Sequence, residues 1–327
     1  MITRNDVAKL AGVSTATVSR VVNNFEHIRP EVREKVLNVI KMLKYEPNIF
    51  ARNLKTNKTK TIVYLVQSLS NTYFNDIYKG ISKISLKYGY VASIYKNQFK
   101  ENLLEILINN KVDGIILSSP LSKKESLILK ESNIPYIYLN TASTHVSEHS
   151  INIDIPKATE HIVDYLYKMG HKNIGLITDK NSMENERIMG YKRALDKHQI
   201  SFCPSYIKCF KGSEYSYKEG YEVMKKFISE GSDITAIIAN NDLIAIGAMR
   251  AAYEAKIRVP DDISFVAFDD SIVSNYVIPS LTTVKLFPYQ QGEIAAKMLF
   301  DLICNNPIEK VQIKTQFIIR ESVKDIR

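Results

Sequence analysis

The sequence predicts a small all-α helix-turn-helix head followed by an α/β core of two doubly wound parallel-sheet subdomains. Two short amphipathic stretches separated by a glycine lie at the N-terminus, within residues 3–23. From Thr61 onward, apolar runs rich in β-branched residues alternate with helical stretches, as in parallel sheets with crossover helices. At 327 residues with 45% hydrophobic content, the chain is long enough for a small head and two units with cores of their own.

A first short helix is predicted between Thr3 and Gly12. Thr3 precedes Asp6 by three residues, so its hydroxyl can cap the helix while the Asp6 carboxylate lies in the positive first turn. Three apolar residues share one face at helical spacing: Val7, Leu10 and Ala11. Gly12 supplies the left-handed conformation that ends a helix at the least steric cost.

A second helix is predicted over 15–23, with Ser14 as its N-cap. Its inward side consists of Val18, Val21 and Val22, and its solvent side of Thr15, Ala16, Thr17 and Arg20. Small residues followed one turn later by an arginine suit the DNA major groove, where a guanidinium can pair with O6 and N7 of guanine. The alternative is an ordinary helical hairpin with a solvated arginine.

The next residues favour the DNA-binding interpretation. Pro30 suits the first position of a third helix, whose apolar stripe consists of Val32, Val36, Ile40 and Leu43. The segment 49–56 is too short to form a stable helix alone. It places Leu54 between Arg52 and Lys55, a combination that suits a minor groove, where an apolar side chain unstacks one base step and cations hold the phosphates.

The positive charge is concentrated in this same region. Residues 1–60 contain twelve Lys or Arg and five Asp or Glu, a formal charge of +7, whereas the rest of the chain contributes +2 to the total of +9. A surface that binds DNA phosphates requires such a concentration. We therefore expect binding to double-stranded DNA that weakens steeply with salt.

Three segments resemble a known protein family: DVAKLAGVSTATVSRVVN, YEPNIFARNLKT and KTKTIVYLV. In these segments the chain resembles the LacI/GalR (lactose-repressor/galactose-repressor) family of bacterial transcriptional regulators, and the resemblance extends through nearly the whole chain. It implies base contacts by Thr15, Ala16 and Arg20, and phosphate contacts by Ser14, Thr17 and Asn23. It also implies a hinge helix at about 48–56 that contains Ala51, Arg52, Leu54 and Lys55. The DNA-binding domain is therefore placed at 1–57.

The remainder, 58–327, shows the alternation of an α/β core. The predicted strands are 62–66, 91–95, 114–117, 136–139, 174–178, 236–239 and 263–268. Helical stretches separate most of them, for example 75–88, 156–169, 184–198 and 242–255. The expected arrangement is two sheet units with a ligand cleft between them at the carboxyl ends of the strands.

The resemblance implies a periplasmic-binding-protein-like core, in which the chain crosses between subdomains more than once. We expect crossings near 155–160, 284–290 and 317–320. One subdomain then covers about 58–157 plus 288–318, and the other about 158–287 plus 319–327.

Several polar and aromatic residues follow predicted strands and are candidate contacts for a small-molecule effector. They are Ser70, Asn71, Tyr73, Phe74, Arg187, Tyr215, Asn241 and Asp269. Carboxylate, guanidinium and amide groups with aromatic faces suit vicinal sugar hydroxyls and apolar ring faces. Arg187 and Asp269 lie in the motifs ERIMGY and FDD, which resemble effector-contact motifs of the family. The alternative for Tyr73 and Phe74 is a core position, and for Tyr215 an ordinary loop position.

A sugar or sugar phosphate is the leading hypothesis for the effector. The pair Tyr73-Phe74 resembles that of purine-responsive members, so a purine or other non-sugar effector is the alternative. Inducer and corepressor modes both remain open, and a corepressor protein is a further candidate partner. The chain ends without leucine heptads, so we expect a homodimer that reads a pseudo-palindromic operator.

Other functional classes find little support. No apolar run approaches the ~20 residues that span a bilayer, and the N-terminus lacks a secretory h-region, which argues against a membrane protein or a transporter's solute-binding protein. The three cysteines form no CxxC, as expected for free thiols in the cytoplasm. No histidine has metal-ligand spacing, and no GxGxxG, GxxxxGK[ST] or GxSxG occurs. We therefore expect no metal, no cofactor and no enzyme activity.

Overall fold

A computed structural model describes residues 2–22, 25, 27–45, 58–97, 102–118, 121–139, 149–179, 186–210 and 214–327. The chain forms two compact units, Met1–Thr59 and Lys60–Arg327. The predicted DNA contacts Asn23, Ala51, Arg52, Leu54 and Lys55 lie outside the described residues.

The described part of the first unit folds into α1 (Arg4–Ala11), α2 (Thr15–Val22) and α3 (Pro30–Leu43). Thr3 caps α1 as predicted, and the Asp6 side chain also accepts from the Thr3 backbone, which makes the cap reciprocal; Gly12 ends α1 with a φ of 61°. Ser14 accepts a hydrogen bond from the Thr17 backbone N–H at 3.1 Å, which confirms its role as cap of α2. Leu10 was expected on the buried face but is 51% exposed, because residues 7, 8 and 11 form the face that meets the other helices.

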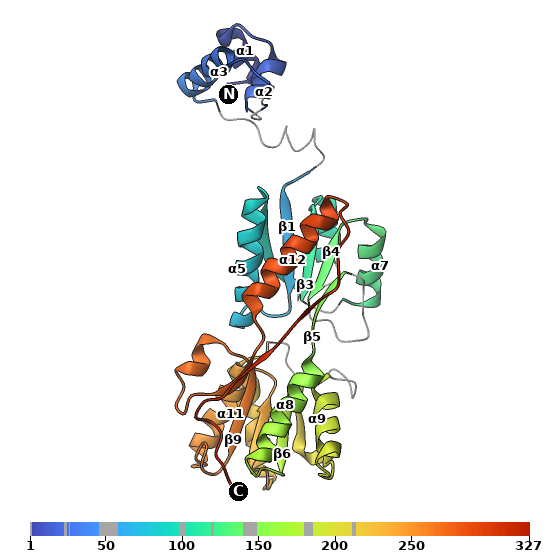
Figure 1. Cartoon of the computed structure of the whole chain (residues 1–327), viewed down its shortest axis with the longest axis vertical. Helices are drawn as coiled ribbons and strands as arrows, with labels where there is room; N and C mark the ends of the chain where they lie inside the picture. The colour runs from blue at the N-terminus through green and yellow to red at the C-terminus, as the bar shows by residue number, and fades with distance from the viewer. Residues whose placement is uncertain are drawn as a thin grey trace. The chain divides into compact units, whose positions relative to one another are not determined.

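The residues that the structure describes in the second unit form two six-stranded sheets, one in each subdomain (Figure 1). The first is parallel throughout and has the order β11 (Val311–Ile313), β5 (Ser150–Ile153), β4 (Tyr136–Leu139), β3 (Gly114–Ser118), β1 (Thr61–Val66), β2 (Val91–Lys96). The second has the order β12 (Gln316–Ile318), β10 (Thr282–Lys285), β9 (Ser264–Asp269), β8 (Ala236–Ala239), β6 (Ile174–Asp179), β7 (Ile207–Phe210). Its strands are parallel except for β12, which pairs antiparallel with β10.

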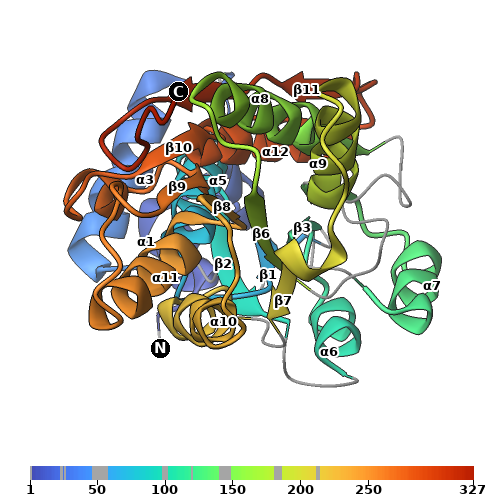
Figure 2. The same ribbon diagram turned by 90° about the horizontal axis from the view of Figure 1, so that it is seen from below.

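Helices cover both faces of each sheet. In the first subdomain, α5 (Thr72–Lys87) and α12 (Pro288–Ile303) lie on one face, and α6 (Leu103–Asn109) and α7 (Lys123–Glu131) on the other. In the second, α8 (Ile155–Lys168) and α9 (Glu186–Lys197) lie opposite α10 (Tyr217–Ser229) and α11 (Asp242–Glu254), as Figure 2 shows from below.

The alternation of side chains along a strand distributes the apolar residues between these layers. In β9, Val266 and Phe268 join the core beneath α8 and α9, whereas Phe265 and Ala267 join the core beneath α10 and α11. A strand buried on both faces therefore reads as a continuous apolar run, which is why β9 was predictable.

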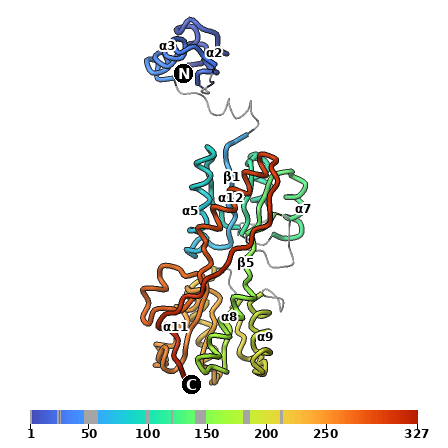
Figure 3. The backbone as a smooth tube through the Cα atoms, viewed as in Figure 1, coloured from blue at the N-terminus to red at the C-terminus, as the bar shows by residue number. Residues whose placement is uncertain are grey.

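Within the described residues, the chain crosses between the subdomains at three places, which Figure 3 traces along the backbone. These crossings join β5 to α8, β10 to α12, and β11 to β12. The last one was expected at 317–320 but falls between Ile313 and Gln316. Residues 316–318 consequently belong to the second subdomain rather than the first, because β12 completes the second sheet by pairing with β10. None of the described helices has the length and apolar character needed to cross a membrane.

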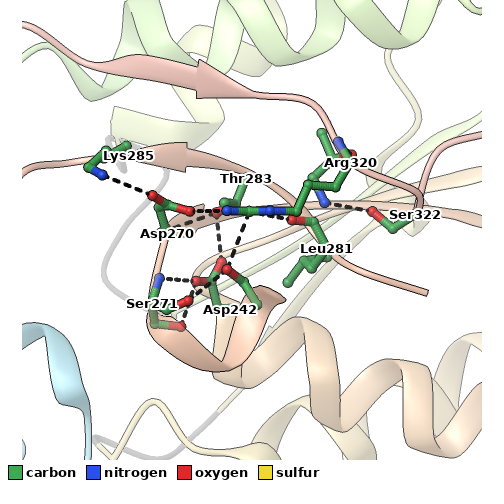
Figure 4. Close-up of polar contacts among 10 residues, drawn as sticks. Asp242, Asp270, Ser271, Leu281, Thr283, Lys285, Arg320 and Ser322 are labelled. Carbon is green, nitrogen blue, oxygen red and sulfur yellow. Dashed lines mark hydrogen bonds and ion pairs between the residues drawn. The ribbon is translucent and has the colours of Figure 1, made fainter. Parts of the chain in front are cut away.

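A buried carboxylate connects α11 to the end of the second sheet. Asp242 is fully buried, and its side chain accepts hydrogen bonds from the Ser271 backbone N–H and hydroxyl, both at 2.7 Å, and from the Thr283 hydroxyl at 2.6 Å (Figure 4). The three donors come from the residues after β9 and from β10, so Asp242 holds these segments together.

The C-terminal segment fastens to the same region. Arg320 donates to the Asp270 carboxylate at 2.5 Å and to the Leu281 carbonyl at 2.8 Å, and Lys285 forms an ion pair with Asp270 at 3.3 Å (Figure 4). Ser322 donates to the Phe265 carbonyl at 2.6 Å. These bonds fix the C-terminal segment along β9, from Phe265 near its start to Asp270 just after its end.

The Asp242 network makes stability depend on pH. Burial raises the pKa of Asp242 to about 6, against the hydrogen bonds from Thr283 and Ser271. Because this pKa lies above that of the unfolded chain, the contribution of Asp242 to the unfolding free energy falls as pH rises from about 4 to about 6. We expect the difference in unfolding free energy between the wild type and Asp242→Asn to fall by on the order of 2 kcal/mol over this interval, measured by urea denaturation.

Asp262→Asn serves as the control, because Arg258 lowers the pKa of the exposed Asp262 to about 2. Asp262 stabilises the folded state above the pKa that it has in the unfolded chain, and this contribution is lost only as pH falls toward 2. The difference in unfolding free energy between the wild type and Asp262→Asn should therefore stay nearly constant between pH 4 and 6. A rising or constant difference for Asp242→Asn would contradict the prediction.

Candidate functional site

Residues that follow strands of the two different sheets meet at the junction between the subdomains. Asn71, after β1, lies close enough to Asp269, the last residue of β9, for its side-chain amide to lower the pKa of that carboxyl. Asn71 also caps α5, because its side chain accepts a hydrogen bond from the Tyr73 backbone N–H at 2.9 Å. The two candidate contacts are thereby joined across the subdomains, although they are distant in sequence.

Asp269 is a buried carboxylate in an unusual backbone conformation. It is 8% exposed, and its φ of 109° lies in a region that residues other than glycine rarely adopt. Burial, followed by the nearby Asp242 charge, raises its pKa well above the ordinary value, whereas the Arg187 charge and the Asn71 hydrogen bond lower it. A ligand that donates hydrogen bonds to this carboxylate would stabilise its charged form.

Arg187, the second residue of α9, lies close to this carboxylate. Its guanidinium carbon is 4.7 Å from the centroid of the Phe268 ring, a cation–π contact with the residue that precedes Asp269. The aromatic ring supports one face of the guanidinium, whose N–H donors lie in its plane. Arg187 and Asp269 can together bind a group that both accepts and donates hydrogen bonds.

Tyr215 joins the same cluster. Its hydroxyl donates to the Asp179 carboxylate at 2.8 Å, and its own φ is 54°. Burial and the Asp179 charge raise its pKa, so the hydroxyl is protonated at neutral pH. Arg187 also interacts electrostatically with Tyr215, which places the two predicted contacts near each other.

Three predicted contacts have internal partners. Asn241 caps α11 by accepting from the Ile244 backbone N–H at 2.9 Å, and its amide donates to the Tyr215 carbonyl at 3.2 Å. Tyr73 and Phe74 are 9% and 8% exposed and pack edge to face against each other. The Tyr73 hydroxyl also donates to Gln291 at 3.0 Å. Both aromatic residues belong to the large hydrophobic core that contains residues of both subdomains.

Sequence reasoning missed a second polar group beside Ser70. Glu214 of the second subdomain accepts hydrogen bonds from Ser68 and Ser70 at 3.3 and 3.4 Å and forms an ion pair with Lys96. Ser68 follows β1, and Lys96 ends β2. The search for polar residues at strand ends, which identified Ser70 and Asn71, would therefore also have identified these two. Glu214 lies in a loop, where no sequence pattern marked it.

In the first unit, the predicted base-reading side of α2 is open to solvent. Ser14, Thr15, Ala16 and Arg20 are exposed, and Thr17 is half-buried with its hydroxyl 2.9 Å from that of Ser14. Val18 and Val21 face the core as predicted. Within the described ranges, no three His, Cys, Asp or Glu side chains are grouped as a metal site requires.

Two family models match the chain. "Bacterial regulatory proteins, lacI family" matches residues 3–48, and "Periplasmic binding protein-like domain" matches residues 163–323. The first match falls on α1, α2 and α3, and the second covers much of the α/β core.

Curated relatives match over nearly their whole length. Catabolite control protein A of Priestia megaterium is 32% identical, with 99% of each chain covered. The HTH-type transcriptional repressor PurR of Haemophilus influenzae is 31% identical over 100% of each. The probable HTH-type transcriptional repressor ExuR of Bacillus subtilis is 33% identical over 99% of each.

Solved structures agree in fold. The lac repressor dimer bound to operator and the anti-inducer ONPF has a TM-score of 0.87, with 27% identity and 99% coverage of each chain. A LacI-family regulator of Enterococcus faecium with bound ribose has a TM-score of 0.73 at 28% identity, covering 82% of this chain and 100% of that one. The CelR–cellobiose complex has a TM-score of 0.74 at 26% identity, covering 98% and 100%. The chain belongs to the lacI family of bacterial transcriptional regulators.

Proposed function

We propose that the chain is a repressor that binds a pseudo-palindromic operator as a homodimer, under the control of a sugar or sugar-phosphate effector. The observation that carries the proposal is the joining of Asn71, Arg187 and Asp269 across the two subdomains, in a chain whose α2 exposes Thr15, Ala16 and Arg20. A ligand that contacts residues of both subdomains can favour one relative orientation over another.

The polar groups at the junction support a carbohydrate. A sugar ring carries adjacent hydroxyls that donate to a carboxylate such as Asp269 and accept from a guanidinium such as Arg187. Two similar solved regulators contain bound ribose and cellobiose, which favours the same chemical class here. The burial of Tyr73 and Phe74 argues against their stacking on a flat base, so the purine alternative has less support.

Control would act through the crossings between the subdomains. Three segments of the described chain connect them, so a change in their relative orientation is constrained to a limited set of movements. We infer that the effector shifts the equilibrium between an orientation that binds the operator and one that does not. Inducer and corepressor modes both fit this scheme.

The DNA-reading assignment predicts a specific loss in Arg20→Ala. Sequencing of genomic fragments captured by the purified protein should enrich one pseudo-palindrome. Arg20→Ala should then weaken binding to that operator by about 1–3 kcal/mol and leave random DNA nearly unaffected, because a bidentate guanine contact is specific to sequence. Fluorescence anisotropy with operator and random duplexes measures both losses.

Lys41→Ala is the charge-matched control, since Lys41 is exposed in the last turn of α3. It should change operator and random binding by similar factors. Equal losses on both duplexes for Arg20→Ala would remove Arg20 from base reading.

The effector assignment predicts a loss of response in Asp269→Asn. A screen of sugars, sugar phosphates and purines against the operator complex identifies the effector. The half-maximal effector concentration should rise about 100-fold in Asp269→Asn, since a charge-assisted hydrogen bond is lost from a buried site. Operator affinity without effector should remain within about threefold of the wild type.

Asp262→Asn, at an exposed position, serves as the control and should respond to the effector normally. An unchanged response in Asp269→Asn would rule out the assigned contact.

Dimerisation is supported by apolar side chains exposed around η3 (Ile272–Asn275). Ile272, Tyr276 and Ile278 are 67, 79 and 96% exposed. Large apolar groups exposed together mark protein interaction surfaces. We infer that this surface contacts the second copy.

Ile278→Asp should therefore raise the dimer dissociation constant by roughly 30-fold or more, the effect of losing an interface residue worth about 2 kcal/mol. Sedimentation equilibrium measures it. Leu127→Asp provides the control, because Leu127 is 60% exposed on α7, away from η3 in the sequence and in the other subdomain. If both variants remain equally dimeric, the interface lies elsewhere.

A further inference from the structure

We propose that the effector carries an anionic group, a phosphate or a carboxylate, and that Ser68, Ser70 and Lys96 bind this group in place of the Glu214 carboxylate. The inference rests on the proposed function, because it concerns the ligand of the same junction. It concerns residues other than Arg187 and Asp269, and it makes Glu214 an internal competitor of the ligand.

The starting observation is that a carboxylate already occupies this position. Glu214 Oε2 accepts hydrogen bonds from the Ser68 and Ser70 hydroxyls at 3.3 and 3.4 Å, and Glu214 Oε1 forms an ion pair with the Lys96 ammonium. The three donor groups belong to the first subdomain, whereas Glu214 belongs to the second. The donors therefore form an anion-binding group whose present occupant comes from the opposite side of the junction.

The local backbone arrangement favours an anion at this point. Ser68 and Ser70 lie between the end of β1 and the start of α5, and Lys96 is the last residue of β2. β1 and β2 are neighbouring parallel strands with Val66 opposite Lys96, so the lysine and the serines lie at the same edge of the sheet. α5 is 16 residues long, and the positive end of its dipole adds to the lysine charge.

Part of this group is held in place without Glu214. Ser68 is fully buried, its hydroxyl lies 2.9 Å from that of Ser70, and the Ser70 backbone N–H donates to Ser68 Oγ at 3.3 Å. The Lys96 side chain is 17% exposed. An incoming anion would thus meet hydroxyl and ammonium groups whose positions are largely determined by the fold.

Glu214 binds the two serine hydroxyls only loosely, which favours its replacement by a ligand anion. Hydroxyl donors usually approach an oxygen acceptor to about 2.7–2.8 Å, and both serine contacts are longer. The Glu214 side chain is also 39% exposed, so its carboxylate can return to water at low cost. A phosphate or ligand carboxylate bound to Lys96 and the serines would break a contact that joins the subdomains, and would thereby connect binding to their relative orientation.

The test compares the full-length wild type with Glu214→Gln and with the double variant Glu214→Gln/Lys96→Met. Thermal midpoints are measured against inorganic phosphate and against acetate, with potassium chloride at matched ionic strength as reference. Removal of the competing charge should lower the apparent dissociation constant for phosphate about tenfold in Glu214→Gln, because the site is no longer occupied by Glu214. The gain should disappear in the double variant. Acetate shows whether a carboxylate binds as well as a phosphate.

Phosphate stabilisation that is equal in all three proteins would place the anion elsewhere and overturn the inference, as would no stabilisation beyond chloride in Glu214→Gln. Should Glu214→Gln fail to fold, Glu214→Asp, whose shorter side chain reaches less far toward Lys96, should show the same gain with smaller amplitude.

A neutral sugar that fully controls operator binding, with no phosphate gain in Glu214→Gln, would contradict the anionic effector and leave the proposed function intact. Absence of an operator would instead overturn the proposed function alone.

Discussion

The arrangement of the junction depends on one property of parallel sheets: all their strands end at the same edge. The ends of β1 and β2 carry Ser68, Ser70, Asn71 and Lys96, and the ends of β6 and β9 carry Asp179 and Asp269. Hydrogen bonds and an ion pair connect groups from the two edges, so the edges face each other. Loops at this edge can therefore change in sequence without affecting the apolar layers, which lie along the strands.

This arrangement requires the burial of two neighbouring carboxylates, Asp242 and Asp269. Burial is the largest cause that raises the pKa of each; the Asp242 charge raises the pKa of Asp269 further, and the Asp270 charge raises that of Asp242. Asp242 receives three hydrogen bonds from Ser271 and Thr283, whereas Asp269 depends on Asn71 and on the Arg187 charge. Asp242 is thus fully engaged within one subdomain, and Asp269 takes part of its support from the other. This difference makes Asp269, rather than Asp242, sensitive to the orientation of the subdomains.

The local features of this fold were predictable from the sequence, and the long-range ones were not. The Thr3–Asp6 cap, the Gly12 turn and the Ser14 cap depend on residues within four positions, and continuous apolar runs marked strands such as β8 and β9. The short strands β5, β7, β10, β11 and β12 were missed because their pairing depends on neighbours far away in the chain. The contact between Lys96 and Glu214, 118 residues apart, follows from packing alone. Tyr73 and Phe74 occupy the first turn of α5, where sequence alone could not decide between the core and the ligand.

The energetics of control follow from which subdomain supplies each contact. A ligand that touched residues of one subdomain only, and displaced no contact between the two, would bind both orientations equally and would shift no equilibrium, however tightly it bound. Asp269 and Arg187 belong to the second subdomain, and Asn71, Ser68 and Lys96 to the first. A molecule that contacts both sets, or that displaces Glu214 from Lys96, therefore has different affinities for the two orientations. A tenfold difference in affinity corresponds to about 1.4 kcal/mol, which is comparable to one or two hydrogen bonds to charged groups. The free-energy change when a ligand oxyanion replaces the Glu214 contact is of this size. It is therefore sufficient to alter the balance between two orientations of similar free energy.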